Sequence, residues 1–190
     1  MSDTTAKFSV ADFTSKISKV GLASPNKFEM WFHSIPSQGS DEMGQLNLMC
    51  DQATLAGRDV QAVLDLQYGI RSQVVYNAPT YTPLTLSFLC SDNMKEKKIL
   101  DLWNNKCVDI TKNFNVGYYS DYIGELDVYV LDRSGKNRTY HMHYHEIYPK
   151  TVNAIELNHS TTNATVRVNA TFEYAFWTTK GIHSGQHIRS

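Results

Sequence analysis

The residues best suited to chemistry form one histidine-rich run, His141-Met142-His143-Tyr144-His145. In a β-strand, His141, His143 and His145 would project from one face, with neighbouring imidazoles roughly 6.5–7 Å apart. Two of them and a ligand from elsewhere could hold zinc or iron in a metal-dependent β-barrel enzyme. Strand alternation alone also explains the spacing, because imidazoles can line a half-polar sheet face. We therefore predict no metal site and no cofactor, and keep the enzyme as an alternative.

Other catalytic or nucleotide-binding motifs are absent from the sequence. It contains no G-x-S-x-G, no G-x-G-x-x-G and no Walker loop. Its cysteines, Cys50, Cys90 and Cys107, are odd in number and widely spaced, which argues against a disulfide framework or a zinc ribbon. The formal net charge of −1 leaves no basic excess for tight DNA binding. The absence of such motifs is only weak evidence against an enzyme.

Length and composition indicate an ordinary folded domain. The chain has 190 residues, of which 42% are hydrophobic and 19% charged. The first residues are polar, and no run reaches the roughly 20 apolar residues that a membrane span requires. We expect one domain with an appended arm or tail, and no membrane anchor.

The elements that must position these residues are mostly strands. Apolar and polar residues alternate over 27–32, 45–50, 84–90, 125–130 and 165–176. Such alternation is typical of antiparallel sheets with one buried face. The segment 133–136 predicts a hairpin turn, and 34–44 predicts a polar loop rich in Gly, Pro and Ser.

Helical spacing interrupts this pattern twice. Residues 10–22 predict a short helix that ends at Gly21. Residues 93–107 predict a second helix, whose Trp103 would dock on the sheet. The last residues, 178–190, are polar and predict a mobile tail.

Residues 59–77 predict a long hairpin that turns at Tyr68-Gly69. One of its faces is apolar, and the other carries amides and charges. A lone hairpin is marginal in water, so this one requires other strands beside it. From these residues alone, the polar face could contact bulk water or line a wet channel shared between subunits.

A series of short motifs in a fixed order resembles one protein family. The motifs are Asn26–Met30, 49–57, the 59–77 hairpin, the 84–92 strand leading to the Trp103 helix, Tyr118–Tyr122, Ile147–Val152 and Phe176-Trp177. Taken together, these motifs make the chain similar to the tail tube proteins of T-even-type contractile-tailed bacteriophages. That family is related in fold to the tube protein of type VI secretion. The resemblance covers about residues 24–177, and the longer 34–44 loop and the tail after Trp177 depart from it.

The resemblance implies a mainly β fold with one short helix docked on the sheets. It implies an antiparallel β-sandwich or half-barrel whose long hairpin completes a β-barrel shared between the subunits of a hexameric ring. We expect an N-terminal arm with a short helix at 1–24, a tail-tube β domain at 25–177, and a polar C-terminal tail at 178–190.

The resemblance also implies a structural role in the virion, so we predict that the protein is not an enzyme. Homo-hexameric rings would stack into the inner tube of a contractile tail, which conducts the genome into the host after assembly in the host cytoplasm. Partners would be further copies of the chain, the surrounding sheath, the baseplate and the tail terminator, with transient, non-specific passage of genomic DNA.

Two groups of residues take specific roles in this interpretation. The lumen would be lined by Asp59, Gln61, Asp65, Gln67, Arg71 and Gln73. Ring-to-ring contacts would come from the N-terminal segment and from Pro36, Ser37, Gln38, Gly39, Ser40, Asp41 and Glu42.

Alternatives within the same class are a secretion-system tube protein and a baseplate tube initiator. From other classes, the histidine run keeps the metal-dependent enzyme open. The aromatic residues Tyr118 and Tyr119 keep open a carbohydrate-binding β-sandwich module.

Overall fold

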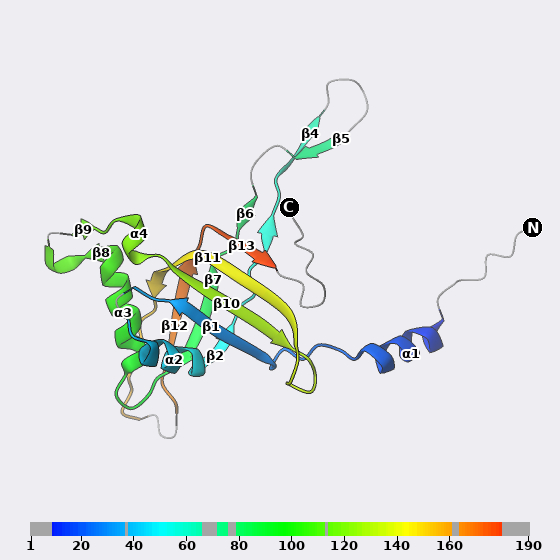
Figure 1. Ribbon diagram of the computed structural model, residues 1–190, viewed down its shortest axis with the longest axis horizontal. Coiled ribbons are helices and arrows are strands. Elements are labelled where there is room, and N and C mark those ends of the chain that lie inside the picture. Colours follow the sequence, from blue (N-terminus) through cyan, green and yellow to red (C-terminus); the bar gives the residue numbers. More distant parts are fainter. Residues whose placement is uncertain are drawn as a thin grey trace, which may run out of the picture. The chain divides into compact units, whose positions relative to one another are not determined.

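The computed structural model describes residues 9–36, 38–65, 72–75, 79–112, 114–160 and 164–179. The helices are α1 (Val10–Val20), α2 (Ser40–Leu48), α3 (Lys95–Cys107) and α4 (Tyr119–Tyr122), with a 3-10 turn at Ile110–Lys112 (Figure 1). The strands are β1 (Phe28–Ser34), β2 (Cys50–Ala53), β3 (Arg58–Asp59), β4 (Ala62–Asp65), β5 (Ser72–Val75), β6 (Thr80–Tyr81), β7 (Leu84–Leu89), β8 (Val108–Asp109), β9 (Asn115–Val116), β10 (Gly124–Leu131), β11 (Arg138–Val152), β12 (Arg167–Glu173) and β13 (Phe176–Thr179). The predicted mainly β class is confirmed, although the short helices number more than expected.

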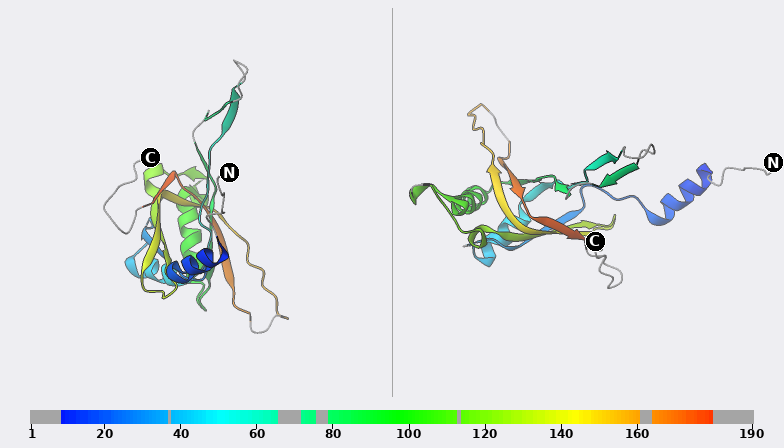
Figure 2. Two further views of the ribbon diagram at one scale, coloured as in Figure 1. Left: turned by 90° about the vertical axis from the view of Figure 1, so that its right-hand side faces the viewer. Right: turned by 90° about the horizontal axis from the view of Figure 1, so that it is seen from above.

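One large sheet organises these strands. Its order is β1-β10-β11-β12-β7-β2, and β13 also pairs with β11. Figures 1 and 2 show β1, β10 and β11 side by side. The pairs β11–β12, β12–β7 and β2–β7 are antiparallel, as the alternating sequence predicts. Among the described residues, β1 and β2 are the end strands of this order.

The core lies on one face of the sheet. Antiparallel register places Val168 opposite Phe88, Ala170 opposite Leu86, and Phe172 opposite Leu84. All six of these side chains are buried. Helix α3 adds its buried residues Ile99, Leu100 and Trp103. The strand alternation and the docking of Trp103 are therefore confirmed.

Two compact units divide the chain. The first comprises the described part of residues 1–29, 128–142 and 179–190, and the second comprises residues 30–127 and 143–178. Strands β1, β10 and β11 contribute residues to both units.

The first unit contains α1 and a tight turn. Ser9 and Asp12 form a reciprocal capping box at the start of α1, and Gly21 ends the helix with φ 76°. In the predicted 133–136 turn, the Asp132 carboxylate accepts hydrogen bonds from Ser134 and Asn137. These bonds lower the pKa of Asp132. The predicted helix and the predicted turn are both confirmed.

The sequence misassigned the segment between β1 and β2. Residues 45–50 were expected to form a strand and 34–44 a loop, but α2 occupies Ser40–Leu48. The Glu42 carboxylate accepts a hydrogen bond from the Gly39 N–H at 2.5 Å, which caps the start of α2. Leu46 is buried, whereas Leu48 is exposed. The alternation of Leu46 and Leu48 therefore belongs to a helix that buries only Leu46, and the strand prediction for 45–50 is wrong through Leu48. The loop prediction is wrong from Ser40 onward.

The long hairpin also differs from its prediction. Two short ladders replace the continuous strands: β3 pairs with β6, and β4 pairs with β5. Residues 60–61 interrupt the first strand. The register pairs Asp65 with Ser72, and the predicted turn at Tyr68-Gly69 lies outside the described residues.

The last predicted strand, 165–176, breaks before its end. Strand β12 stops at Glu173 and β13 begins at Phe176. The Tyr174 hydroxyl donates a hydrogen bond to the Thr82 carbonyl oxygen at 2.7 Å, which anchors the break. Strand β13 continues to Thr179, two residues past the predicted end of the β domain.

A buried carboxylate joins α2 to α3. Glu96 accepts hydrogen bonds from the Ser91 N–H and hydroxyl at 2.8 and 2.9 Å, and from the Gln45 amide at 2.8 Å. Burial raises the pKa of Glu96, but these hydrogen bonds outweigh it and leave the pKa lowered. The charged form is therefore the one that stabilises the fold.

Replacing Glu96 with glutamine is expected to lower the free energy of unfolding by about 1–3 kcal/mol at pH 7. The glutamine amide has only one acceptor oxygen, whereas both carboxylate oxygens of Glu96 accept hydrogen bonds from Ser91 and Gln45. A lowered folded-state pKa contributes stability above the unfolded carboxyl value, and that stability is lost as pH falls. The penalty should therefore shrink below about pH 4. Urea unfolding at pH 7 and below about pH 4 measures this penalty, and Asp92→Asn, at an exposed position, is the control. An equal penalty at both pH values would contradict this role of the charge.

Within the described residues, no helix has the length and apolar character to span a membrane. The three cysteines are free. Burial raises the pKa of the Cys50 thiol to about 12 and that of Cys107 to about 11, so neither behaves as a reactive thiolate.

Candidate functional site

The predicted lumen residues fall on the two short ladders. Asp59 ends β3 opposite Thr80, and Gln61 follows it; both side chains are exposed. Asp65 and Gln73 occupy β4 and β5, where Gln73 pairs with Leu64. The other two predicted lumen residues, Gln67 and Arg71, lie outside the described residues. The interruption at 60–61 means that strand alternation alone does not put all six on one face.

The predicted ring-contact residues lie around the start of α2. Pro36, Gln38 and Gly39 precede the helix, and Ser40, Asp41 and Glu42 form its first turn. Ser37 lies outside the described residues. Asp41 is exposed and lies in the first turn of α2, where the helix dipole favours an acidic side chain.

The histidine run occupies β11, with Met142 and Tyr144 buried between its members. The Tyr144 hydroxyl accepts a hydrogen bond from the Ala56 N–H at 3.1 Å. His141 belongs to the first unit, where its ring stacks on Tyr129 at 4.5 Å between centroids.

His143 and His145 belong to the second unit and contact each other, with ring centroids 4.2 Å apart. His145 stacks on Phe176 and hydrogen-bonds the Thr178 hydroxyl at 3.1 Å. His143 lies 2.5 Å from Asp127, measured from Nδ1 to Oδ1.

Asp127 also contacts a histidine from a third strand. His33 Nε2 lies 2.6 Å from Asp127 Oδ2, so the carboxylate stands between two imidazoles. Sequence reasoning missed both His33 and Asp127. The alternation of residues 27–32 and 125–130 predicted two strands, but it did not indicate that these strands are neighbours in the sheet.

Glu146 departs from the strand pattern in a different way. It adopts a left-handed backbone conformation with φ 55°, which redirects its side chain within β11. Its carboxylate accepts a hydrogen bond from the Tyr119 hydroxyl of α4 at 2.8 Å. Burial and this bond raise the pKa of Tyr119 to about 12. Glu146 therefore links α4 to the sheet.

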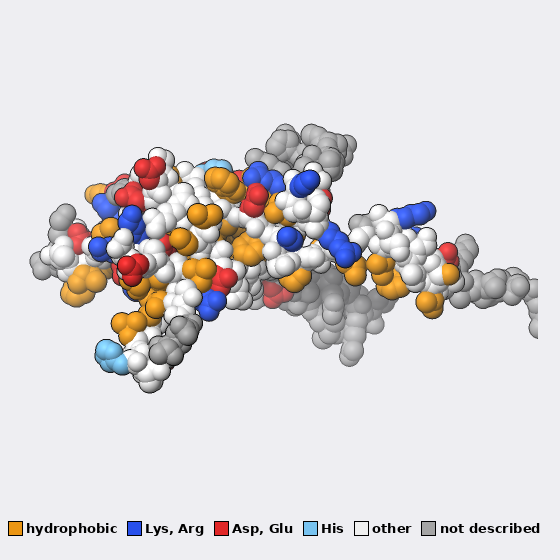
Figure 3. Space-filling model, turned by 90° about the horizontal axis from the view of Figure 1, so that it is seen from below, with side chains coloured by type: hydrophobic (Ala, Val, Ile, Leu, Met, Phe, Trp, Pro, Cys, Tyr) orange, Lys and Arg blue, Asp and Glu red, His pale blue; other side chains and the backbone are white. Residues whose placement is uncertain are grey.

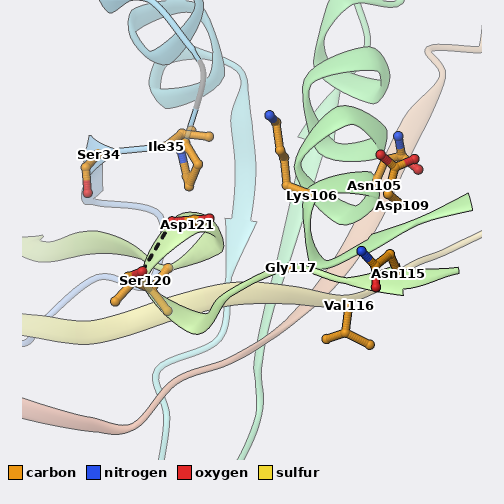
Figure 4. A pocket seen from close by; sticks show the side chains of 12 residues that line it. Ser34, Ile35, Asn105, Lys106, Asp109, Asn115, Val116, Gly117, Ser120 and Asp121 are labelled. Atoms are coloured by element: carbon orange, nitrogen blue, oxygen red, sulfur yellow. Dashed lines mark hydrogen bonds between the residues drawn. The ribbon is translucent and has the colours of Figure 1, made fainter. Parts of the chain in front are cut away.

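A groove of about 660 Å³ opens beside α3 and α4 (Figure 4). The residues that line it are Ser34, Ile35, Pro36, Asn105, Lys106, Asp109, Asn115, Val116, Gly117, Ser120, Asp121 and Ile123. Most of these side chains are polar, and Lys106, Asp109 and Asp121 are charged. The groove is therefore a polar surface that another molecule could contact.

Exposed apolar side chains gather next to the groove. They come from α3, β8, β9 and the adjoining turns: Leu102, Val108, Ile110, Phe114, Val116 and Tyr118. Tyr118 is 82% exposed. Figure 3 also shows apolar side chains exposed on α1, where Val10 and Phe13 are both exposed. Surfaces of this kind are typical of protein–protein contacts.

The profile of one protein family, described as phage tail tube protein, matches residues 13–180. The chain belongs to this family. The resemblance predicted from the sequence is thus confirmed, and the structural role of the family argues against an enzyme.

Several solved structures have a similar fold. A chain from the sheath-tube complex of the extracellular contractile injection system PVC has a TM-score of 0.59 at 13% identity, covering 89% of this chain and 98% of that one. A chain of the PVC sheath/tube terminator has a TM-score of 0.59 at 11% identity, covering 85% and 99%. A chain of the six-fold symmetrised anti-feeding prophage baseplate has a TM-score of 0.57 at 9% identity, covering 86% and 98%. No curated protein matches the chain.

For a tail tube family member, the exposed apolar patch, the polar groove and the sheet edges are the candidate functional surfaces. They are suited to contacts with other protein surfaces. The chain covers 98–99% of the length of each of these three solved chains.

Proposed function

We propose that the chain is a structural subunit, without enzymatic activity, whose homo-hexameric rings stack into the inner tube of a contractile tail. The observation that carries this proposal is the match of the phage tail tube family to residues 13–180. The likeness to a chain of the PVC sheath-tube complex supports it, because that likeness extends over 98% of that chain.

The open sheet supports closure by neighbouring copies. Strands β1 and β2 end the strand order, so each has a backbone edge that no described strand covers. Exposed edges of this kind invite pairing with another chain. In our proposal, neighbouring subunits cover these edges, and the β3–β6 and β4–β5 ladders complete a barrel shared around the ring.

The interior of that ring would carry the genome. We propose that it is lined by the six residues predicted from the sequence: Asp59, Gln61, Asp65, Gln67, Arg71 and Gln73. A polar or negatively charged wall would not bind phosphates, so DNA would pass without stalling. Arg71 is the exception, and Asp65 or a neighbouring acid would offset its charge.

Stacking would use the segment before and within the first turn of α2, Pro36–Glu42, together with the N-terminal arm. Asp41 is its most suitable test position, because its side chain is exposed and, unlike Glu42, does not accept the hydrogen bond from the Gly39 N–H that caps α2. Deleting the whole segment would remove the start of α2 and so confuse folding with stacking.

The proposed partners follow from the same role. They are the tail sheath, the baseplate and the tail terminator, and the assembled tube would reside in the virion after assembly in the host cytoplasm. The solved relatives come from a sheath-tube complex, a baseplate and a sheath/tube terminator. We also propose the domain boundaries given by the resemblance, with the tail-tube β domain at 25–177.

Light scattering of the purified chain tests ring formation. Six chains of 21.6 kDa give about 130 kDa, the mass expected for one ring. Asp41→Lys should keep this mass but prevent the larger stacked species. The control Asp92→Lys, at another exposed aspartate, should form both the ring and the stacked species. A mass of one chain at every concentration would oppose the proposal, and stacking by Asp41→Lys would oppose the assigned contact.

A further inference from the structure

Three neighbouring strands each supply one metal-ligating side chain to the same point of the sheet. His33 comes from β1, Asp127 from β10 and His143 from β11, and these strands are consecutive in the sheet order. Because adjacent strands lie about 4.8 Å apart, side chains on one face of such a row converge. The described ligand atoms of the three residues all lie within 4.8 Å of one another.

The carboxylate of Asp127 is the centre of this row. Its two oxygens lie 2.6 Å from His33 Nε2 and 2.5 Å from His143 Nδ1. The side chain of Asp127 is only 8% exposed, so its negative charge is largely removed from water. A buried carboxylate requires a paired group or a metal ion beside it, and here both oxygens already pair with imidazole nitrogens that are themselves common metal ligands.

The surroundings are suited to an ion. The His33 side chain is 49% exposed, which gives the cluster a direct route to solvent. His145 and Glu125 lie close enough to form a second, overlapping group with His143. His145 is held by a hydrogen bond between its Nε2 and the Thr178 hydroxyl.

We propose that His33, Asp127 and His143 bind a divalent transition-metal ion, with zinc as the best match. Two imidazole nitrogens and one carboxylate oxygen are a ligand set that zinc accepts, with water in a fourth position. Ligand atoms around tetrahedral zinc lie roughly 3.4 Å apart, given bonds of ~2.1 Å. Ion binding would therefore lengthen both contacts of Asp127, from 2.6 Å to His33 and from 2.5 Å to His143.

The ion would join three strands and so act as a structural clip. It would hold β1, the end strand of the sheet, to β10 and β11. This role differs from the metal enzyme considered from the sequence. That site drew two histidines from the run in β11 and was catalytic, whereas the proposed ion takes one ligand from each of three strands and holds them together.

Titration of tag-free, full-length protein with zinc, and with cobalt as a spectroscopic probe, tests the proposal. Calorimetry should show one zinc per chain, and cobalt should give the visible absorption of a tetrahedral site. His33→Ala and His143→Ala should each weaken binding at least tenfold. The matched control is His159→Ala, an exposed histidine between β11 and β12, which should bind as the parent does.

Zinc should also raise the melting temperature of the parent and leave that of His33→Ala unchanged. If His143→Ala fails to fold, His33→Ala still decides, because half of its side chain is already in solvent. The double variant His183→Ala, His187→Ala removes the histidines near the C-terminus and should retain the site. Absence of binding at 1 mM metal, or unchanged affinity in His33→Ala, would overturn the proposal.

Discussion

Replacing Trp103 with alanine is expected to lower the free energy of unfolding by about 3–5 kcal/mol. The side chain is buried between Phe32 and Phe172, with ring centroids 5.7 and 5.8 Å away. Its indole N–H donates a hydrogen bond to the Tyr122 carbonyl oxygen at 2.7 Å. The substitution would therefore leave a cavity under α3 and an unpaired carbonyl group at the end of α4.

Urea unfolding of the dissociated subunit, followed by circular dichroism, measures this loss. Leu102→Ala is the matched control, because Leu102 is the preceding residue of α3 and is 57% exposed. We expect the control to change stability by about 0.5 kcal/mol or less. Equal effects for the two variants would show that α3 does not dock through Trp103.

Replacing Gly124 with alanine is expected to cost about 3 kcal/mol, although it adds only one methyl group. An added Cβ would overlap the Ser34 carbonyl oxygen, which belongs to the backbone of β1 and cannot rotate away. It would also lie 3.1 Å from the Trp103 ring. The start of β10 thus needs glycine because the end of β1 and the α3 tryptophan both approach it closely.

A second glycine supplies the control for this experiment. Gly44 lies in α2, is exposed, and has no neighbouring atom within 4 Å of an added Cβ. Gly44→Ala should therefore stabilise the protein by up to about 1 kcal/mol, since alanine favours a helix interior. Thermal unfolding of both variants gives the comparison, and a Gly124→Ala variant as stable as the parent would refute the proposed close approach.

Local sequence patterns predicted the elements that have one clear face. The alternation of β7 and β12 persists in the structure because Leu86 and Ala170 face each other in the core. Helix α3 was predictable for the same reason, since its apolar spacing places Trp103 on the buried side. Apolar periodicity succeeds where one face of an element decides its burial.

Patterns failed where tertiary contacts decide the local structure. In α2, the spacing of Leu46 and Leu48 imitates a strand, but the capping by Glu42 and the hydrogen bond from Gln45 to Glu96 favour a helix. Similarly, Tyr174 interrupts the last strand through a bond to Thr82, which lies far away in sequence. Contacts between residues so distant in sequence leave no local trace.

The candidate site was only partly predictable for a related reason. The histidines of β11 were recognisable by type, yet their partners depend on strand order. Asp127 and His33 are 94 residues apart and become neighbours because β10 lies beside β1. Such order follows from the whole fold and not from the composition of any one strand.

Electron microscopy of the purified, full-length chain at increasing concentration tests the central claim most directly. A tube subunit should form hexameric rings and then hollow tubes of uniform diameter without any other protein. Chains from a baseplate and from a sheath/tube terminator have a similar fold. Rings that never extend into tubes would therefore indicate a subunit from one end of a tube. Particles that remain single subunits at every concentration would contradict the account.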